Sequence, residues 1–192
     1  ETIRRMASLK PAAPDFTIMW DNAYCIHELD GEYVPFPDIL KICEEAGNPD
    51  MVFEFASTSK ITFPGAGISA MASSEENIAY HLKLISVQTI SYDKINQLRH
   101  ANYFKNKAGI DAHMLRHAEI LKPKFDAVLN AFDSELAGKG IASWTVPNGG
   151  YFISLDVCEG CAKRTVALCK EAIAMMQLKQ CADFWRIIQM PM

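Results

Sequence analysis

Short apolar runs separated by helical and turn segments mark the first third of the chain. Residues 16–20 and 51–56 are rich in apolar and aromatic side chains, and both runs are short enough to be buried strands. Residues 67–72 predict a further short strand. Between the first two runs, Asp38 is placed as the N-cap of a helix that ends near Gly47. This order of elements predicts a layered α/β sheet.

Helical patterns dominate the next part of the chain. The stretch Ser73-Ser74-Glu75-Glu76 supplies an N-cap and an acidic first turn for a helix that is expected to run to about Val87. A second helix is predicted from residues 92–105. A third and longer one is predicted from residues 111–136, because apolar side chains recur there at helical spacing. Pro123 lies inside that pattern and is expected to kink the helix.

The last part of the chain predicts a hairpin and a helix. Residues 142–146 and 151–157 read as paired strands, and the turn between them is predicted at Asn148-Gly149. Residues 161–172 form an amphipathic helical pattern.

Composition and charge narrow the class of protein. The chain has 192 residues, is 49% hydrophobic and 22% charged, and carries a net charge of −4, as globular proteins commonly do. It has no long basic run and no apolar run of about 18 residues, so neither nucleic acid nor a membrane is an expected partner. The first 13 residues resemble a charged helix rather than a signal peptide. Six scattered cysteines favour free thiols in a cytoplasmic protein.

Two motifs have the spacing of metal or redox sites. Cys158 and Cys161 form a Cys-x-x-Cys pair, but no second pair accompanies them, so we expect free thiols and no metal. His113 and His117 are four residues apart on a predicted helix, a spacing that can bind a metal. Because no third ligand is evident, solvated or locally hydrogen-bonded histidines are the preferred interpretation.

Lys60 carries the most distinctive candidate chemistry. It follows the apolar run 51–56 and the hydroxyl residues Ser57-Thr58-Ser59, and it precedes a turn rich in glycine. A lysine buried there would have a lowered pKa, and a neutral amine is a nucleophile suited to a Schiff base. The same local pattern also occurs in ordinary loops. Asp21 ends the strand run 16–20, and the carboxyl ends of parallel strands form one sheet edge where ligands bind.

Three ordered motifs together resemble those of class I/II aminotransferases, which are fold-type I enzymes dependent on pyridoxal 5'-phosphate. They are Asp21-Asn22-Ala23-Tyr24, Ser57-Thr58-Ser59-Lys60 and Pro147-Asn148-Gly149-Gly150-Tyr151-Phe152. The sequence around Lys60 is most similar to that of the aspartate aminotransferase Ic subgroup. The resemblance implies an α/β fold: part of the large mixed-sheet cofactor domain at residues 1–110, then a linking helix and part of the small α/β domain at 111–172. Residues 173–192 are expected to be an unmatched tail.

The resemblance also implies a role for each motif residue. Lys60 would be the catalytic lysine that forms the Schiff base and shuttles a proton. Asp21 would pair with the pyridinium nitrogen, and Tyr24 would hydrogen-bond the phenolic oxygen of the cofactor. Ser57 would contact the phosphate, with Ser59 as a weaker candidate. Taken singly, these residues also fit a turn acid, a packed aromatic ring and locally bonded hydroxyls.

The family pattern is incomplete in this chain. Many members carry a phosphate-binding arginine eight residues after the lysine, where this chain has Ile68. The family's phosphate loop lies upstream of its Asp-x-Ala-Tyr element, and its carboxylate-binding arginine lies beyond the small-domain helix. We therefore expect an interior piece of an enzyme that is inactive alone.

The expected function is the transfer of an amino group from an amino acid, aspartate by resemblance, to a 2-oxo acid such as 2-oxoglutarate. A homodimer is implied for the full-length enzyme. Three alternatives stay open: another reaction on the same scaffold, such as a β-lyase or decarboxylase; a non-enzymatic aminotransferase-like regulator; and an inactive fragment.

Overall fold

The computed structural model describes residues 1–173, so the expected tail lies outside the described residues from residue 174 onward. The chain forms two compact units. The first comprises Glu1–Lys124 together with Asn148–Tyr151, and the second comprises Phe125–Pro147 with the chain from Phe152. The division falls inside a long helix that begins close to the expected limit at residue 110.

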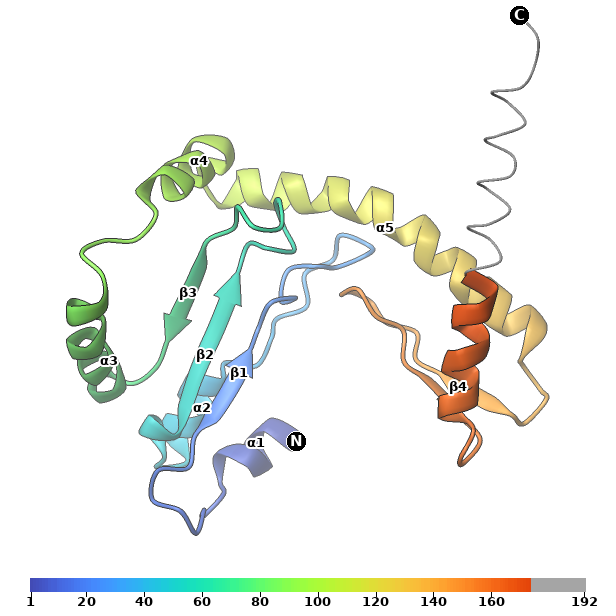
Figure 1. Ribbon diagram of the computed structural model, residues 1–192, viewed down its shortest axis with the longest axis horizontal. Helices are drawn as coiled ribbons and strands as arrows, with labels where there is room; N and C mark the ends of the chain where they lie inside the picture. The colour runs from blue at the N-terminus through green and yellow to red at the C-terminus, as the bar shows by residue number, and fades with distance from the viewer. Residues whose placement is uncertain (174–192) are drawn as a thin grey trace, which may run out of the picture. The chain divides into compact units, whose positions relative to one another are not determined.

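A three-stranded mixed sheet organises the first unit (Figure 1). The strands are β1 (Ile18–Asp21), β2 (Val52–Ser57) and β3 (Ser69–Ala72), in the spatial order β1-β2-β3. β1 and β2 are parallel, with Asp21 opposite Phe55, whereas β3 runs antiparallel to β2. The three predicted strands are therefore confirmed, and β1 and β2 end at the same edge of the sheet.

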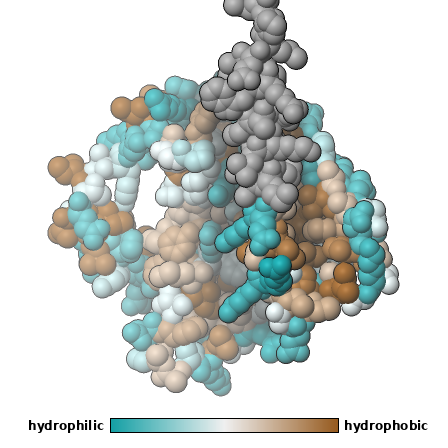
Figure 2. Space-filling view, turned by 45° about the vertical axis from the view of Figure 1, so that its right-hand side comes forward, coloured by the Kyte–Doolittle hydropathy of each residue, from teal (hydrophilic) through white to brown (hydrophobic). Residues whose placement is uncertain are grey.

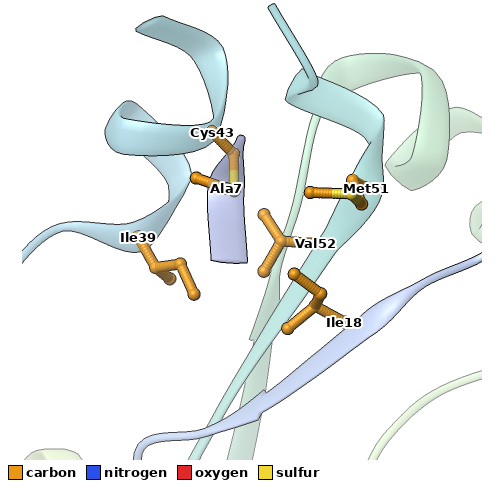
Figure 3. Close-up of a cluster of buried hydrophobic side chains, with 6 residues drawn as sticks. All are labelled: Ala7, Ile18, Ile39, Cys43, Met51 and Val52. Atoms are coloured by element: carbon orange, nitrogen blue, oxygen red, sulfur yellow. The ribbon is translucent and has the colours of Figure 1, made fainter. Parts of the chain in front are cut away.

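A small hydrophobic cluster holds helices against the first two strands (Figure 3). It joins α1 (Thr2–Ala7) and α2 (Ile39–Glu45) to the sheet, and the 3-10 turn Pro49–Met51 leads into β2. The predicted cap of α2 is present, because the Asp38 carboxylate accepts the Lys41 N–H at 3.0 Å. Burial of these apolar side chains anchors the amino-terminal ends of β1 and β2, where Ile18 and Val52 are the first strand residues. The cluster consists of Ala7, Ile18, Ile39, Cys43, Met51 and Val52.

Three helices follow the sheet. α3 (Glu75–Gln88) and α4 (Lys94–Phe104) begin at the N-caps Ser74 and Asp93, close to the helix starts predicted from sequence. α5 (Lys107–Glu135) begins earlier than predicted and continues through Pro123. A second cluster packs Ile61, Phe104 and Met114 together, which joins the turn after β2 to α4 and α5.

The predicted hairpin is only partly correct. β4 (Ala142–Trp144) and β5 (Leu155–Val157) do pair antiparallel, but both strands are shorter than expected. The turn is not a tight one at Asn148-Gly149. Instead, Gly149 forms a β-bridge with Glu28, so backbone pairing with a distant segment replaced the local turn. Residues 162–173 are helical, in agreement with the predicted final helix.

Gly149 is required by this close backbone approach. A Cβ on Gly149 would lie 2.6 Å from the His27 carbonyl oxygen, which is too close for any side chain. The bridge is closed by the Leu29 N–H donating to Asn148 O and the Gly150 N–H donating to His27 O, both at 2.8 Å.

Gly149→Ala is therefore expected to open the bridge and to speed amide exchange at Leu29 and Gly150 about tenfold or more, as overpacking costs about 1–3 kcal/mol. Hydrogen exchange with mass spectrometry on the 192-residue protein would measure this. Asn148→Ala is the matched control, because Asn148 enters the bridge only through its backbone. Unchanged exchange in the Gly149 variant would contradict the close contact.

Many large apolar side chains are exposed, and Figure 2 shows brown hydrophobic groups among hydrophilic ones on the face it presents. Val87 of α3 and Ile95 of α4 are examples, at 85% and 70% exposed. No helix in the described part of the chain is long and apolar enough to cross a membrane.

Candidate functional site

Lys60 lies in the turn that follows β2, and its side chain is exposed. The sequence-based expectation of a buried lysine is thus wrong in this structure. The core-facing position is taken by the next residue, Ile61, which is 8% exposed and packs against Phe104 and Met114. Lys60 therefore faces away from the apolar cluster. Among the described residues, its amine forms neither an ion pair nor a side-chain hydrogen bond and stays available for chemistry.

The backbone of Lys60 is held more firmly than its side chain. The Lys60 carbonyl accepts a hydrogen bond from His27 Nε2–H at 3.2 Å and another from the Tyr151 hydroxyl at 3.0 Å. His27 comes from the segment after β1, and Tyr151 follows the Gly149 bridge. Three segments distant in sequence therefore converge on this turn.

Asp21 ends β1 at the same sheet edge, as the parallel pairing of β1 and β2 requires. Its carboxylate is exposed and accepts the Ala23 N–H at 3.2 Å, which forms a local turn. No ion pair or hydrogen bond joins Asp21 to Lys60 within residues 1–173. The structure thus places both residues at one edge but not in direct contact.

Tyr24 packs beside the lysine turn. Its ring lies 5.5 Å from the ring of His27 and 5.6 Å from that of Tyr151, and those two rings are 5.2 Å apart. Because both neighbours bind the Lys60 carbonyl, Tyr24 is one residue removed from the turn. Tilted and edge-to-face ring pairs at these distances are attractive and orient one another.

The two candidate phosphate serines lie next to each other in the turn. Ser57 ends β2, and its hydroxyl accepts the Ser59 N–H at 3.3 Å. Ser59 is half-buried against Gly67, where an added Cβ would meet its backbone nitrogen and hydroxyl at 3.1 Å. Gly67 thus lets the chain pass close to these hydroxyls. The local bond of Ser57 matches the structural alternative considered from sequence.

Thr58 was overlooked in the sequence, although it does most to organise the turn. Its hydroxyl accepts the Ile68 N–H at 2.9 Å and lies 2.8 Å from His100 Nε2. His100 Nδ1–H donates to the Asn96 carbonyl at 2.7 Å, which leaves Nε2 of the neutral tautomer as an acceptor for the Thr58 hydroxyl. Ile68, which replaces the family's arginine, is tied to Thr58 by this contact. Only a long-range partner could have revealed Thr58, and its local sequence contains no such signal.

His27 has an unusual environment, because it is 3% exposed and its Nδ1 has no hydrogen-bond partner among the described residues. Burial lowers the pKa of the His27 imidazole below 6.5, against smaller raising effects from the Lys60 and Tyr24 carbonyls and from Glu28. The rings of Tyr24 and Tyr151 pack on the His27 imidazole. The pKa of His117 is also lowered, first by its own burial and then by the charges of His113 and His27.

His27 is consequently expected to make the fold acid-sensitive. A histidine with a lowered pKa stabilises the protein fully above its unfolded value of 6.5, and this contribution is lost as the pH falls below that value. Urea unfolding of the 192-residue protein at pH 7.5 and pH 5.5 would measure the loss. His27→Gln should reduce the difference between the free energies of unfolding at pH 7.5 and pH 5.5. Part of the difference should remain, because His117 makes its own contribution. An equal acid loss in wild type and variant would contradict this assignment.

An apolar cavity of about 870 Å³ opens between the lysine turn and helices α4 and α5. His100 and His113 contribute to its wall, and His113 Nε2–H donates to the Ile61 carbonyl at 2.8 Å. The described residues contain no group of three or more metal-ligating side chains. His113 Nδ1 lies 3.3 Å from the Tyr103 hydroxyl, and the rings of His113 and His117 are 4.8 Å apart. Cys158 and Cys161 are exposed free thiols.

The residues present fit pyridoxal phosphate in donor chemistry. Three suitable groups follow the carboxyl ends of β1 and β2. They are the unpaired primary amine of Lys60, the carboxylate of Asp21 and the phenol of Tyr24. A lysine amine can hold an aldehyde covalently, and a carboxylate can pair with a ring nitrogen. Thr58 and Ser59, packed against Gly67, provide hydroxyls in the same turn as Lys60.

Comparison with known proteins identifies relatives that are similar in sequence and fold. The family model described as aspartate amino-transferase matches residues 1–182, which extends beyond residue 172. The aspartate aminotransferase of Corynebacterium glutamicum is 47% identical over 172 residues, covering 90% of this chain and 40% of the relative. The crystal structure of an aspartate transaminase from the same species superposes with a TM-score of 0.83 at 48% identity, over 88% of this chain and 40% of that one.

A shorter match links part of the chain to a regulator. NorG of Staphylococcus aureus, named as an HTH-type transcriptional regulator, is 34% identical over 106 residues, which are 54% of this chain and 23% of NorG.

These matches confirm the predicted α/β fold of the fold-type I aminotransferases. This chain spans about 40% of the length of the aminotransferase that it matches. Because the family model covers nearly the whole chain, the protein belongs to the aspartate amino-transferase family.

Proposed function

We propose that this chain supplies part of the active site of a pyridoxal phosphate-dependent aminotransferase that moves an amino group from aspartate to 2-oxoglutarate. The observation that supports the proposal is the unpaired Lys60 amine, presented on a fixed turn at the sheet edge where Asp21 also lies. A homodimer and a cytoplasmic location belong to the same proposal for the whole protein.

Each candidate residue then has a defined task. Pyridoxal phosphate, when bound, supplies an electron sink for the electrons released at the substrate α-carbon. The Lys60 amine would hold the cofactor covalently and later carry the proton to and from that carbon, which arginine cannot do. The Asp21 carboxylate would keep the ring nitrogen protonated, and the Tyr24 hydroxyl would donate to the phenolic oxygen. Ser57 and Ser59 would donate to the phosphate.

Phosphate binding would need groups outside this turn. Ile68 stands where many family members have arginine, and its backbone N–H is already bound by Thr58. In this proposal the remaining phosphate contacts and the substrate-carboxylate contact come from segments of the relatives that the chain does not cover. A β-lyase or decarboxylase reaction would use the same Lys60 and differ in those segments.

The test uses what we call the completed enzyme. It is the C. glutamicum aspartate aminotransferase in which the segment that matches this chain over 172 residues is replaced by the corresponding part of this chain. Turnover of aspartate with 2-oxoglutarate is expected, and borohydride reduction should attach the cofactor to the peptide containing Lys60. The isolated 192-residue chain should show no turnover, because catalysis depends on positioning the whole constellation. A label at another lysine of this chain would overturn the assignment of Lys60. Turnover by the isolated chain would instead overturn the expectation that it is inactive alone.

The match to NorG keeps a regulatory role as the second candidate. A regulator would also be labelled at Lys60 but would not turn over substrate. The two functions are therefore separated by the assay and not by the label. Labelled completed enzyme without transaminase, lyase or decarboxylase activity would favour the regulator.

A further inference from the structure

The Lys60 carbonyl is bound by two side chains at once. The His27 imidazole donates at 3.2 Å and the Tyr151 hydroxyl at 3.0 Å. A carbonyl oxygen has two lone pairs, so its accepting capacity is fully used. The donors lie 33 and 91 residues away in sequence, which makes the arrangement a product of tertiary folding.

Two further carbonyls of the turn, those of Thr58 before Lys60 and Ile61 after it, also accept hydrogen bonds. The Thr58 carbonyl accepts the Ile61 N–H at 3.0 Å and the Thr62 N–H at 2.8 Å, while the Ile61 carbonyl accepts His113 Nε2–H at 2.8 Å. The backbone of the turn therefore has few ways to move. In contrast, the Lys60 side chain is exposed and unpaired within the described chain. A fixed Cα with a free amine is what a lysine needs if it is to reach two reacting positions in turn.

We propose that His27 and Tyr151 are positioning residues that fix the Lys60 backbone and thereby aim its amine. This inference rests on the proposed function of Lys60. Neither residue needs to touch substrate or cofactor, because each acts through the carbonyl of the lysine itself.

The surroundings of both donors suit the role. The rings of Tyr24, His27 and Tyr151 pack on one another at 5.2–5.6 Å, so each donor is oriented before it binds. Burial raises the pKa of the Tyr151 phenol, and burial lowers the pKa of the His27 imidazole. Tyr151 therefore keeps its donor proton, and His27 is neutral at pH 7 with its proton on Nε2. The Gly149 bridge brings Tyr151 to the turn.

The variants are chosen to remove one donor at a time in the completed enzyme. Tyr151→Phe deletes only the hydroxyl and keeps the ring. His27→Phe removes the imidazole donor, whereas His27→Gln can still donate through its side-chain amide and serves as the conservative rescue. Tyr80→Phe is the matched control, because Tyr80 is 63% exposed on α3, away from the turn.

The first readout is amide hydrogen exchange at Ile61 and Thr62 in the cofactor-free completed enzyme. Tyr151→Phe and His27→Phe should each speed exchange about 2- to 10-fold, as expected for one lost hydrogen bond. The increase in exchange rate in the double variant should exceed the product of the two single increases. The reason is that the second substitution leaves the Lys60 carbonyl with no side-chain donor. Tyr80→Phe and His27→Gln should stay near wild type.

The second readout separates positioning from general stability. With the unfolding midpoint unchanged in Tyr151→Phe, kcat should fall about tenfold while KM stays within about twofold, because orientation of the amine affects the chemical step. Exchange and kcat at the wild-type level in both Tyr151→Phe and His27→Phe would overturn the proposal. A fall in kcat that is accompanied by a lower unfolding midpoint would also overturn it, since that pattern indicates a general loss of structure.

Failure of this inference differs from failure of the proposed function. If borohydride labels Lys60 while the variants behave as wild type, only the positioning role is wrong. If Lys60 is not labelled, the proposed function fails, although the exchange results would still report on the turn.

Discussion

Lys60→Ala is expected to lower kcat of the completed enzyme at least about 10⁴-fold, because one side chain supplies both the covalent attachment and the proton transfer. The exposed and unpaired amine of Lys60 makes it the candidate for both tasks. Steady-state assay with aspartate and 2-oxoglutarate measures the rate. Mass spectrometry after borohydride reduction shows whether the cofactor label leaves the Lys60 peptide.

Two comparisons sharpen this result. Lys60→Arg keeps the positive charge and should be as inactive as Lys60→Ala, since a guanidinium cannot form the covalent link. Lys139→Ala removes a different exposed lysine and should leave turnover unchanged. Substantial activity in either Lys60 variant would show that another amine does the chemistry.

Asp21→Ala is expected to reduce kcat about 10²- to 10³-fold while cofactor affinity falls less than about tenfold. The physical reason is that a carboxylate paired with the ring nitrogen stabilises charge that develops in the transition state more than charge in the resting complex. The position supports this role, because Asp21 and Lys60 follow neighbouring parallel strands at one edge. Cofactor titration by fluorescence and steady-state kinetics give the two quantities.

The local turn at Asp21 must be separated from its charge. Asp21→Asn keeps an oxygen that can accept the Ala23 N–H and removes only the charge, so it should lose nearly as much kcat as Asp21→Ala. Asp30→Ala is the matched control, because the Asp30 carboxylate also accepts an N–H two residues on, from Glu32 at 3.0 Å. Equal losses of kcat and affinity in Asp21→Ala would contradict a transition-state role.

Local sequence was sufficient for most of the helices and strands. α3 and α4 begin at Ser74 and Asp93, within the stretches predicted to start them, since a helix start depends only on residues within one turn. The apolar runs also predicted β1 and β2, and their parallel pairing places Asp21 and the lysine turn at one edge. The motifs around Asp21, Lys60 and Tyr151 were enough to indicate the family.

Only the tertiary structure decided how the lysine turn is held. Asn148-Gly149 predicted a tight hairpin from local propensity, but its backbone pairs with residues 27–29 instead, because long-range hydrogen bonds outweigh a turn preference. Ile61 is buried in place of Lys60, since packing against Phe104 and Met114 favours an apolar side chain over a charged one. The donors to the Lys60 carbonyl are 33 and 91 residues away, so no local pattern could indicate them. Side-chain type and spacing thus determined the elements and the candidate chemistry, whereas contacts between distant segments determined which groups orient the lysine.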